Sequence, residues 1–149
     1  MSVRPVRKSD YDQWLKLWDG YNQFYGRFGA TALDPVITKT TWSRFFDENE
    51  PVFALVYEQE GKILGLTHYL FHRTTTAIGP NCYLQDLFSL AEARGKGIGR
   101  ALIESVREAA ITAKAARLYW QTHETNDTAM LLYNSLAKRS GFLVYGMAL

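Results

Sequence analysis

The residues best suited to chemistry in this chain form one short run: Arg94, Gly95, Lys96, Gly97, Ile98, Gly99 and Arg100. An apolar stretch at 83–90, with the pattern of a strand, precedes the run, and a helical pattern at 98–114 begins inside it. A strand-to-helix junction directs several backbone N–H groups and the positive end of the helix dipole at one point. Glycine lets the main chain approach an anion closely. The run therefore predicts a phosphate or pyrophosphate site, whose simplest ligand is a cofactor with a diphosphate.

Two common nucleotide-binding motifs do not account for this run. A P-loop needs GxxxxGK followed by Ser or Thr, and the chain has no such stretch. The dinucleotide fingerprint GxGxxG differs from the GxGxG spacing here, and no acidic residue closes a second strand at the expected distance, where the chain has Tyr119, Trp120 and Gln121. A glycine-rich turn before a surface helix is the plain structural alternative. A nucleotide-binding domain is a further alternative.

Length, charge and cysteine content narrow the class of protein. With 149 residues, the chain is expected to form one domain, 1–149, whose core needs no disulfide. Its 17 basic and 15 acidic residues give a net charge of +2, which does not predict a nucleic-acid partner. Cys82 is the only cysteine, which favours a reducing compartment. Because no apolar stretch resembles a signal peptide or a membrane span, we expect a cytoplasmic protein without a membrane partner, and nuclear import stays open.

The positions of the histidines argue against a metal site. His68 and His72 lie four residues apart, in a strand-like stretch at 63–73. On a strand this spacing leaves the two side chains well separated on one face. Because no third ligand lies nearby in the sequence, we expect no metal.

The hydrophobic pattern predicts a mixed α/β sheet with helices on its faces. Strands are expected at 3–7, 51–58, 63–73, 83–90, 117–122 and 142–147, and helices at about 10–25, 35–47, 98–114 and 126–138. The order is β-α-α-β-β-β-α-β-α-β. Short turns make the middle strands antiparallel, and the β-α-β unit around the glycine run should be parallel and right-handed.

Three local signatures accompany this order: Arg94-x-x-Gly97-x-Gly99, Asn126 followed seven residues later by Tyr133, and then Gly141-Phe142. Together they resemble the GCN5-related N-acetyltransferase (GNAT) superfamily, whose Gln/Arg-x-x-Gly-x-Gly/Ala loop binds the pyrophosphate of acetyl-CoA. The runs 82–87 and 119–126 further resemble the histone and polyamine (diamine) acetyltransferase subgroup. The resemblance is strongest over 82–145, and before residue 82 it rests mainly on element order.

The resemblance implies a GNAT-like sheet that splays between its fourth and fifth strands. In the family the pantetheine arm of acetyl-CoA, the co-substrate, lies in that gap and pairs with the fourth strand's backbone. Backbone N–H groups and cations of the glycine run hold the pyrophosphate, and the asparagine caps the last helix or contacts the arm. The implied donor-binding residues are Leu87, Phe88, Ser89, Arg94, Gly95, Lys96, Gly97, Ile98, Gly99, Arg100 and Asn126.

The resemblance also implies attack of a neutral amine on a thioester. Tyr133 matches the family's tyrosine near the coenzyme A sulfur and can serve as general acid for the leaving thiolate, although a core aromatic is the structural alternative. Many relatives carry a glutamate base on the fourth strand, where this chain has Gln85. Strand alternation sends Asp86 to the opposite face. A bulge in the strand could redirect it, but nothing in the sequence shows one. His123 and Glu124 are other candidates, so the base is left unassigned and a route through ordered water is favoured.

Acceptor recognition would rest on aromatic and acidic side chains. The candidates for an aromatic pocket around a cationic amine are Tyr21, Tyr25, Phe28, Tyr69 and Tyr83, although core packing also explains such a stripe. An ammonium group could pair with Asp19, Asp86 or Glu124.

We therefore predict an acetyl-CoA-dependent N-acetyltransferase that acts on a primary amine. The acceptor is a polyamine, an amino acid or the lysine of a peptide. A non-catalytic acetyl-CoA-binding regulatory module is the alternative, which Gln85 favours. The predicted last strand, 142–147, would lie at an edge of the sheet, and this favours a homodimer.

Overall fold

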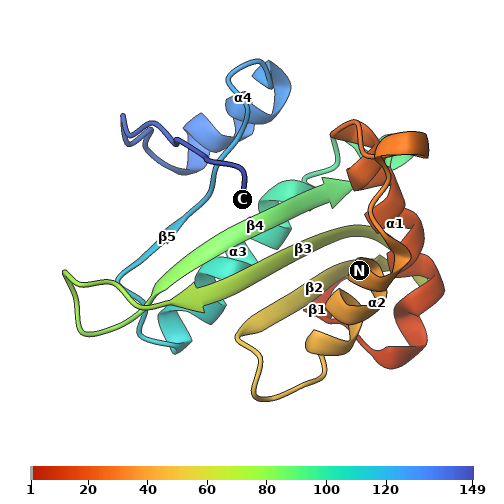
Figure 1. The fold of residues 1–149 in the computed structure, drawn as a ribbon, viewed down its shortest axis with the longest axis horizontal. Helices are drawn as coiled ribbons and strands as arrows, with labels where there is room; N and C mark the ends of the chain where they lie inside the picture. The colour runs from red at the N-terminus through yellow and green to blue at the C-terminus, as the bar shows by residue number, and fades with distance from the viewer. Residues whose placement is uncertain (1) are drawn as a thin grey trace.

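The computed structural model describes residues 2–149 and contains one five-stranded sheet, in the order β1-β2-β3-β4-β5 (Figure 1). The strands are β1 (Ser2–Pro5), β2 (Val52–Gln59), β3 (Lys62–His72), β4 (Asn81–Ser89) and β5 (Arg117–Tyr119). Neighbours from β1 to β4 are antiparallel, and β4 and β5 are parallel. The predicted mixed α/β sheet is thereby confirmed.

The described residues form four α-helices: α1 (Tyr11–Phe24), α2 (Pro35–Arg44), α3 (Ile98–Thr112) and α4 (Asp127–Leu136). Short 3-10 turns, η1 (Lys8–Asp10), η2 (Gly29–Thr31) and η3 (Ala91–Ala93), connect them to their neighbours. In Figure 1, α3 passes behind the sheet, α1 and α2 lie on its other side, and α4 stands beyond β5. Within residues 2–149, no helix is long and apolar enough to cross a bilayer.

The sheet separates two hydrophobic cores, as strand alternation requires. On one face Leu102 and Val106 of α3 pack with Leu84 of β4. On the other face Trp14 and Leu17 of α1 pack with residues of β2 and β3. The buried stripes of α1 and α3 repeat at three- and four-residue steps, which is why their sequences predicted helices correctly.

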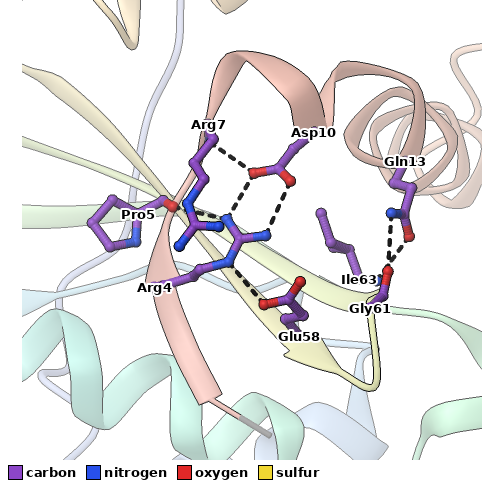
Figure 2. A network of polar contacts seen from close by, with 8 residues as sticks. All are labelled: Arg4, Pro5, Arg7, Asp10, Gln13, Glu58, Gly61 and Ile63. Carbon is purple, nitrogen blue, oxygen red and sulfur yellow. Dashed lines mark hydrogen bonds and ion pairs between the residues drawn. The ribbon is translucent and has the colours of Figure 1, made fainter.

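A cluster of charged side chains fastens the start of α1 to β1 and β2 (Figure 2). Arg4 donates from Nη1 and Nη2 to the carboxylate of Asp10, at 2.8 and 3.0 Å, and from Nε to Glu58 Oε2 at 3.0 Å. The backbone N–H of Arg7 donates to the same Asp10 carboxylate at 2.7 Å. Next along the helix, Gln13 bonds to backbone groups of Gly61 and Ile63. These contacts place the α1 face that carries the aromatic side chains against the sheet.

The predicted strand at 142–147 is wrong. Residues 137–149 form neither helix nor strand, and the apolar side chains of this tail are exposed, with Phe142 at 87% and Tyr145 at 91%. A strand needs a neighbour to accept its hydrogen bonds. The adjacent edge is short because β5 ends at Tyr119 instead of continuing to 122 as predicted, so the tail has too little backbone beside it to pair with.

Candidate active site

The edge of β4 that faces β5 is open over most of its length. The two strands pair only at Asn81–Arg117, Cys82–Leu118 and Tyr83–Tyr119, and then separate. Residues 84–89 continue to pair with β3 on the other side. Their remaining backbone N–H and C=O groups therefore face a gap in which an extended ligand could pair as an added strand.

The side chains at this open edge belong to the two cores. Leu87 packs with the α3 core, close to Leu132 of α4, whereas Phe88 packs on the α1 side, edge-on to Tyr21 at 6.3 Å. Their side chains are thus occupied by packing. At this edge Leu87, Phe88 and Ser89 can offer a ligand mainly their backbone.

The glycine run forms the N-terminus of α3. Its first intrahelical hydrogen bond runs from the N–H of Ala101 to the carbonyl of Gly97, at 3.0 Å. The N–H groups of Ile98, Gly99 and Arg100 therefore have no acceptor within the helix. Gly97 occupies the N-cap in the left-handed conformation, with φ 79°. These donors and the helix dipole point out of the helix at one place, which suits an anion.

Two glycines of the run leave space above the backbone. Gly95 and Gly97 both have φ 79°, and a Cβ at either would meet no atom within 4 Å. Gly99 serves another purpose, because a Cβ there would lie 3.2 Å from Leu132 Cδ2. The first two glycines permit the turn and the approach of a ligand, and the third permits α3 and α4 to pack closely.

The three cations of the run differ in their contacts. Arg94 lies over the ring of Phe88, with its guanidinium carbon 5.6 Å from the ring centroid. Arg100 donates to Ser135 Oγ of α4 at 2.9 Å. Lys96 is exposed. All three lie beside the helix start, and Arg100 also ties α3 to α4.

Tyr133 lies half-buried on α4, against Trp120, with ring centroids 5.6 Å apart and planes at 64°. Burial, and then the proximity of Tyr25, raise the pKa of the Tyr133 phenol. Among residues 2–149 no side chain or backbone group hydrogen-bonds to its hydroxyl. The phenol is therefore protonated at neutral pH and its proton is available to a ligand.

An open cavity of about 570 Å³ lies between the end of α1 and the loop before α4. Its lining residues are Phe24, Tyr25, His123, Thr125, Asn126, Asp127 and Thr128. Asn126 occupies the N-cap of α4, but its side chain makes no capping bond and instead donates from Nδ2 to Thr122 Oγ1, at 3.3 Å. Of the two roles expected for Asn126, the side-chain cap is therefore wrong, because the preceding turn places Thr122 within reach of the amide.

The predicted aromatic pocket is only partly assembled. Tyr21 and Tyr25 lie together at the end of α1, with ring centroids 5.0 Å apart. Phe28 is exposed in the following loop, and Tyr69 points to the opposite face of the sheet, against Phe53. These two residues do not join the others.

Tyr83, by contrast, lies on the same side of the sheet as Tyr21 and Tyr25 and close to Tyr25. Burial raises its pKa first, followed by the nearby Tyr119, Asp86 and Tyr25. Arg27 lies over the rings of both Tyr21 and Tyr25, at 5.8 and 5.4 Å. A cation of the protein itself thus occupies part of the aromatic surface that the sequence suggested for an amine.

β4 contains a β-bulge, which the sequence analysis named as possible but could not locate. His68 pairs with Asp86 while the next residue, Tyr69, pairs with Leu84, so that Gln85 is left without a partner. The extra residue turns Asp86 to the α1 face, where its carboxylate lies 2.9 Å from His68 Nδ1. No motif in the sequence marks this bulge. The expectation that alternation sends Asp86 to the opposite face is therefore wrong.

The sequence of the chain is similar to those of known proteins. A model described as the acetyltransferase (GNAT) family matches residues 12–137. The D-amino-acid N-acetyltransferase HPA3 of Saccharomyces cerevisiae is 34% identical over 145 residues, which cover 96% of this chain and 88% of the yeast protein. The thialysine N-epsilon-acetyltransferase of Bos taurus is 35% identical over 74 residues, covering 50% of this chain and 43% of the bovine protein.

Solved structures agree on the fold. A probable acetyltransferase superposes with a TM-score of 0.84 at 18% identity, and the match covers 100% of this chain and 98% of that one. The family model spans the open β4 edge, the glycine run and α4, and the yeast relative extends the likeness to almost the whole chain. The chain therefore belongs to the acetyltransferase (GNAT) family and is an N-acetyltransferase.

Proposed function

We propose that this chain, as one domain over 1–149, transfers the acetyl group of acetyl-CoA to the primary amine of a small acceptor. The observation that supports this most directly is the position of the open β4 edge beside the free N–H groups of α3. A strand edge suits the amides of pantetheine, and a helix N-terminus suits a pyrophosphate. The same site thus matches both ends of one donor.

The donor would be held mainly by the backbone. Leu87, Phe88 and Ser89 would pair with the pantetheine arm, and the N–H groups from Gly95 to Arg100 would bind the pyrophosphate. Arg94, Lys96 and Arg100 would add positive charge. Asn126, at the cavity between α1 and α4, would contact the arm.

Tyr133 would act as the general acid. When the amine attacks the thioester carbonyl, the C–S bond breaks and the leaving thiolate needs a proton. Burial keeps the Tyr133 phenol protonated, and its hydroxyl is free of protein partners in the described chain. Both properties support this role.

We propose an amino acid as the acceptor, in preference to a polyamine. Arg27 places a positive charge over Tyr21 and Tyr25, and it would repel the second ammonium group of a polyamine but attract a carboxylate. The yeast relative is named for transfer to D-amino acids. A lysine side chain in a peptide lacks a carboxylate close to its amine, so this charge favours it less.

We also propose a cytoplasmic homodimer. The exposed apolar tail, 142–149, would be covered by a second copy, because isolated apolar segments of this size are costly in water. Equilibrium sedimentation of the full chain tests this. A monomer at micromolar concentration would contradict it.

Release of coenzyme A, followed with a thiol reagent, tests acetyl transfer to a panel of D- and L-amino acids, diamines and lysine peptides. Cys82 will not disturb the assay, because it is buried and burial raises its pKa to about 11. Binding of acetyl-CoA without turnover on any amine would favour the non-catalytic module. Thermal protection by ATP but not by coenzyme A would favour a nucleotide-binding domain.

The substitution Gly97→Asp tests the donor site by calorimetry with coenzyme A. It adds a side chain and a negative charge at the helix start, so we expect affinity to fall by about 100-fold. Gly61→Asp is the matched control, because Gly61 has φ 78° and equally open space but lies in the turn between β2 and β3. Equal affinities in the two variants would remove the glycine run from the site.

A further inference from the structure

The proton that the acceptor amine must lose has no assigned destination. An alkyl amine is mostly protonated at neutral pH, and only the neutral form attacks a thioester. Gln85, which stands where many members of the family carry a glutamate, is exposed and is not a base. The bulge at Gln85 instead presents the next residue, Asp86, to the α1 face. The surroundings of Asp86 therefore decide whether it can serve.

Hydrogen bonds determine which nitrogen of the neutral His68 ring carries the proton. Trp14 Nε1 lies 3.0 Å from His68 Nε2. An indole nitrogen can only donate, so Nε2 must accept and carries no proton. The proton of the neutral ring is then on Nδ1, which donates to Asp86 Oδ2 at 2.9 Å. His68 is 3% exposed, so a charged imidazolium would have to break the bond to Trp14 inside the core.

Asp86 is consequently a carboxylate with neutral partners. His68 donates to one oxygen, and Tyr21 approaches closely enough that burial and then the charge and hydrogen bond of Asp86 raise the pKa of its phenol. No lysine or arginine of residues 2–149 forms an ion pair with Asp86. The side chain is 12% exposed, so it reaches solvent while most of its surface is enclosed. An anion in this position lacks a cation.

The other candidate bases are less suited. The backbone N–H of Thr125 donates to His123 Nδ1 at 3.2 Å, so the proton of the neutral His123 ring is on Nε2, the nitrogen left to face a ligand. Glu124 is exposed, so its carboxylate lies in water. Neither is enclosed as Asp86 is.

We infer that Asp86 binds the ammonium group of the acceptor and takes its proton, and that His68 is a positioning residue that holds the carboxylate. This rests on the proposed function. The carboxylate accepts one proton from R–NH₃⁺, and the nitrogen then forms the N–C bond as the C–S bond breaks. Tyr133 protonates the thiolate and recovers the second proton lost by the nitrogen. Asp86 finally returns its proton to solvent, so that acetyl-CoA and the ammonium yield amide, thiol and one proton.

The substitution Asp86→Asn tests this inference, since asparagine can still accept the bond from His68. We expect kcat/KM for the best amine to fall by about 100-fold, with the affinity for coenzyme A within about twofold of the unaltered protein. Asp12→Asn, the same change at an exposed carboxylate of α1, serves as the control and should leave both unchanged. A fall of less than about threefold in Asp86→Asn would overturn the inference and leave acetyl transfer standing.

His68 has its own pair of variants. Asparagine keeps an N–H near the place of Nδ1, whereas leucine has none. We expect His68→Leu to lose about 10-fold in kcat and His68→Asn to retain most of it, with similar losses of Tm because both leave Trp14 without its acceptor. Equal activity in the two would show that His68 only fills space.

If the unaltered protein releases no thiol with any amine, the proposed acetyl transfer is wrong. A binding measurement then tests whether Asp86 still forms an ammonium site. Calorimetry would then compare D-lysine and L-lysine binding to the coenzyme A complex of the unaltered protein and of Asp86→Asn. Binding that Asp86→Asn abolishes supports the site. Equal or absent binding overturns it.

Discussion

Two enclosed carboxylates, Asp10 and Asp86, are treated very differently by this fold. Asp10 accepts two bonds from the Arg4 guanidinium and one from the Arg7 backbone, with Glu58 on the other side of Arg4 (Figure 2). Asp86 accepts from a neutral imidazole and meets a phenol. One carboxylate has its countercharge within the chain, and the other does not.

The difference separates a structural cluster from a functional one. Arg4, and to a lesser degree Arg7, hold the pKa of Asp10 below its ordinary value and keep the group charged. In a charge pair with well-formed hydrogen bonds, the attraction offsets much of the free-energy cost of desolvation. Removing one partner then destabilises the fold strongly, because the other charge stays buried alone. When an enclosed anion has only neutral donors, its hydrogen bonds do not offset the free-energy cost of desolvation. Such groups concentrate at sites where a ligand supplies the missing charge.

Removing the countercharge of Asp10 should have the largest effect on stability. In Arg4→Met the carboxylate remains enclosed without its partner, and we expect the free energy of unfolding to fall by about 3 kcal/mol. Urea denaturation measures this. The control is Arg44→Met, which breaks an exposed 3.8 Å pair with Glu50 and should cost less than about 0.5 kcal/mol. Equal losses would mean that the cluster of Figure 2 is not structural.

Asp86→Asn should lower turnover strongly but hardly change stability. The bond from His68 is kept and an uncompensated charge is removed, so we expect the free energy of unfolding to change by less than about 1 kcal/mol while turnover falls. The same urea titration applies. A loss as large as that of Arg4→Met would make Asp86 a structural residue and would erase the contrast between the two carboxylates.

Tyr133→Phe should reduce turnover more than donor affinity. Phenylalanine keeps the contact with Trp120 but has no proton to give the thiolate, so we expect kcat to fall about 10-fold. Steady-state kinetics and calorimetry with coenzyme A separate the two quantities. If affinity and kcat fall together, Tyr133 is a packing residue.

Arg27→Gln should affect the choice of acceptor. We expect KM for amino acids to rise about fivefold, because the attraction for the carboxylate is lost in partly exposed surroundings. KM for a diamine should not rise. A parallel increase for both acceptors would contradict an amino-acid site. Lys39→Gln, an exposed change on α2, is the control.

Acid should weaken the fold through the Arg4 cluster. Hydrogen bonding to Arg4 lowers the pKa of Asp10 from its ordinary 3.8. Its contribution is therefore fully present above about pH 3.8 and is lost as the pH falls through the lower folded value. Tm measured between pH 2 and pH 6 should fall less steeply in Asp10→Asn than in the unaltered protein. Identical slopes would show that Asp10 does not couple to folding.

Most elements of this fold could be predicted because their signals are local. Trp14, Leu17 and Trp18 recur at helical spacing, Asp34 accepts from Val36 N–H and so caps α2 as an Asp before Pro35 suggests, and Gly61 completes the turn between β2 and β3. The tail at 142–147 has the same apolar pattern as a strand, but a strand also needs a partner edge. That requirement lies outside the segment, and so the prediction was wrong.

The features of the candidate site also fall into those that local sequence predicts and those that depend on distant segments. The glycine run, Tyr133 and the open β4 edge follow from spacing and resemblance, since a helix start and a strand end are determined by neighbouring residues. The placement of Tyr69 and the side chain of Asn126 depended on which atoms other segments brought near. Neither was visible in a local pattern.

By itself, the sequence determined the helices, the first five strands and the glycine turn that begins α3, because propensity, periodicity and glycine conformation act over a few residues. Only the tertiary structure decided which face Asp86 occupies. One extra residue in β4 reverses the alternation, and the strand accommodates it because β3 supplies His68 and α1 supplies Trp14 to hold the result. Contacts between segments far apart in the chain made that choice.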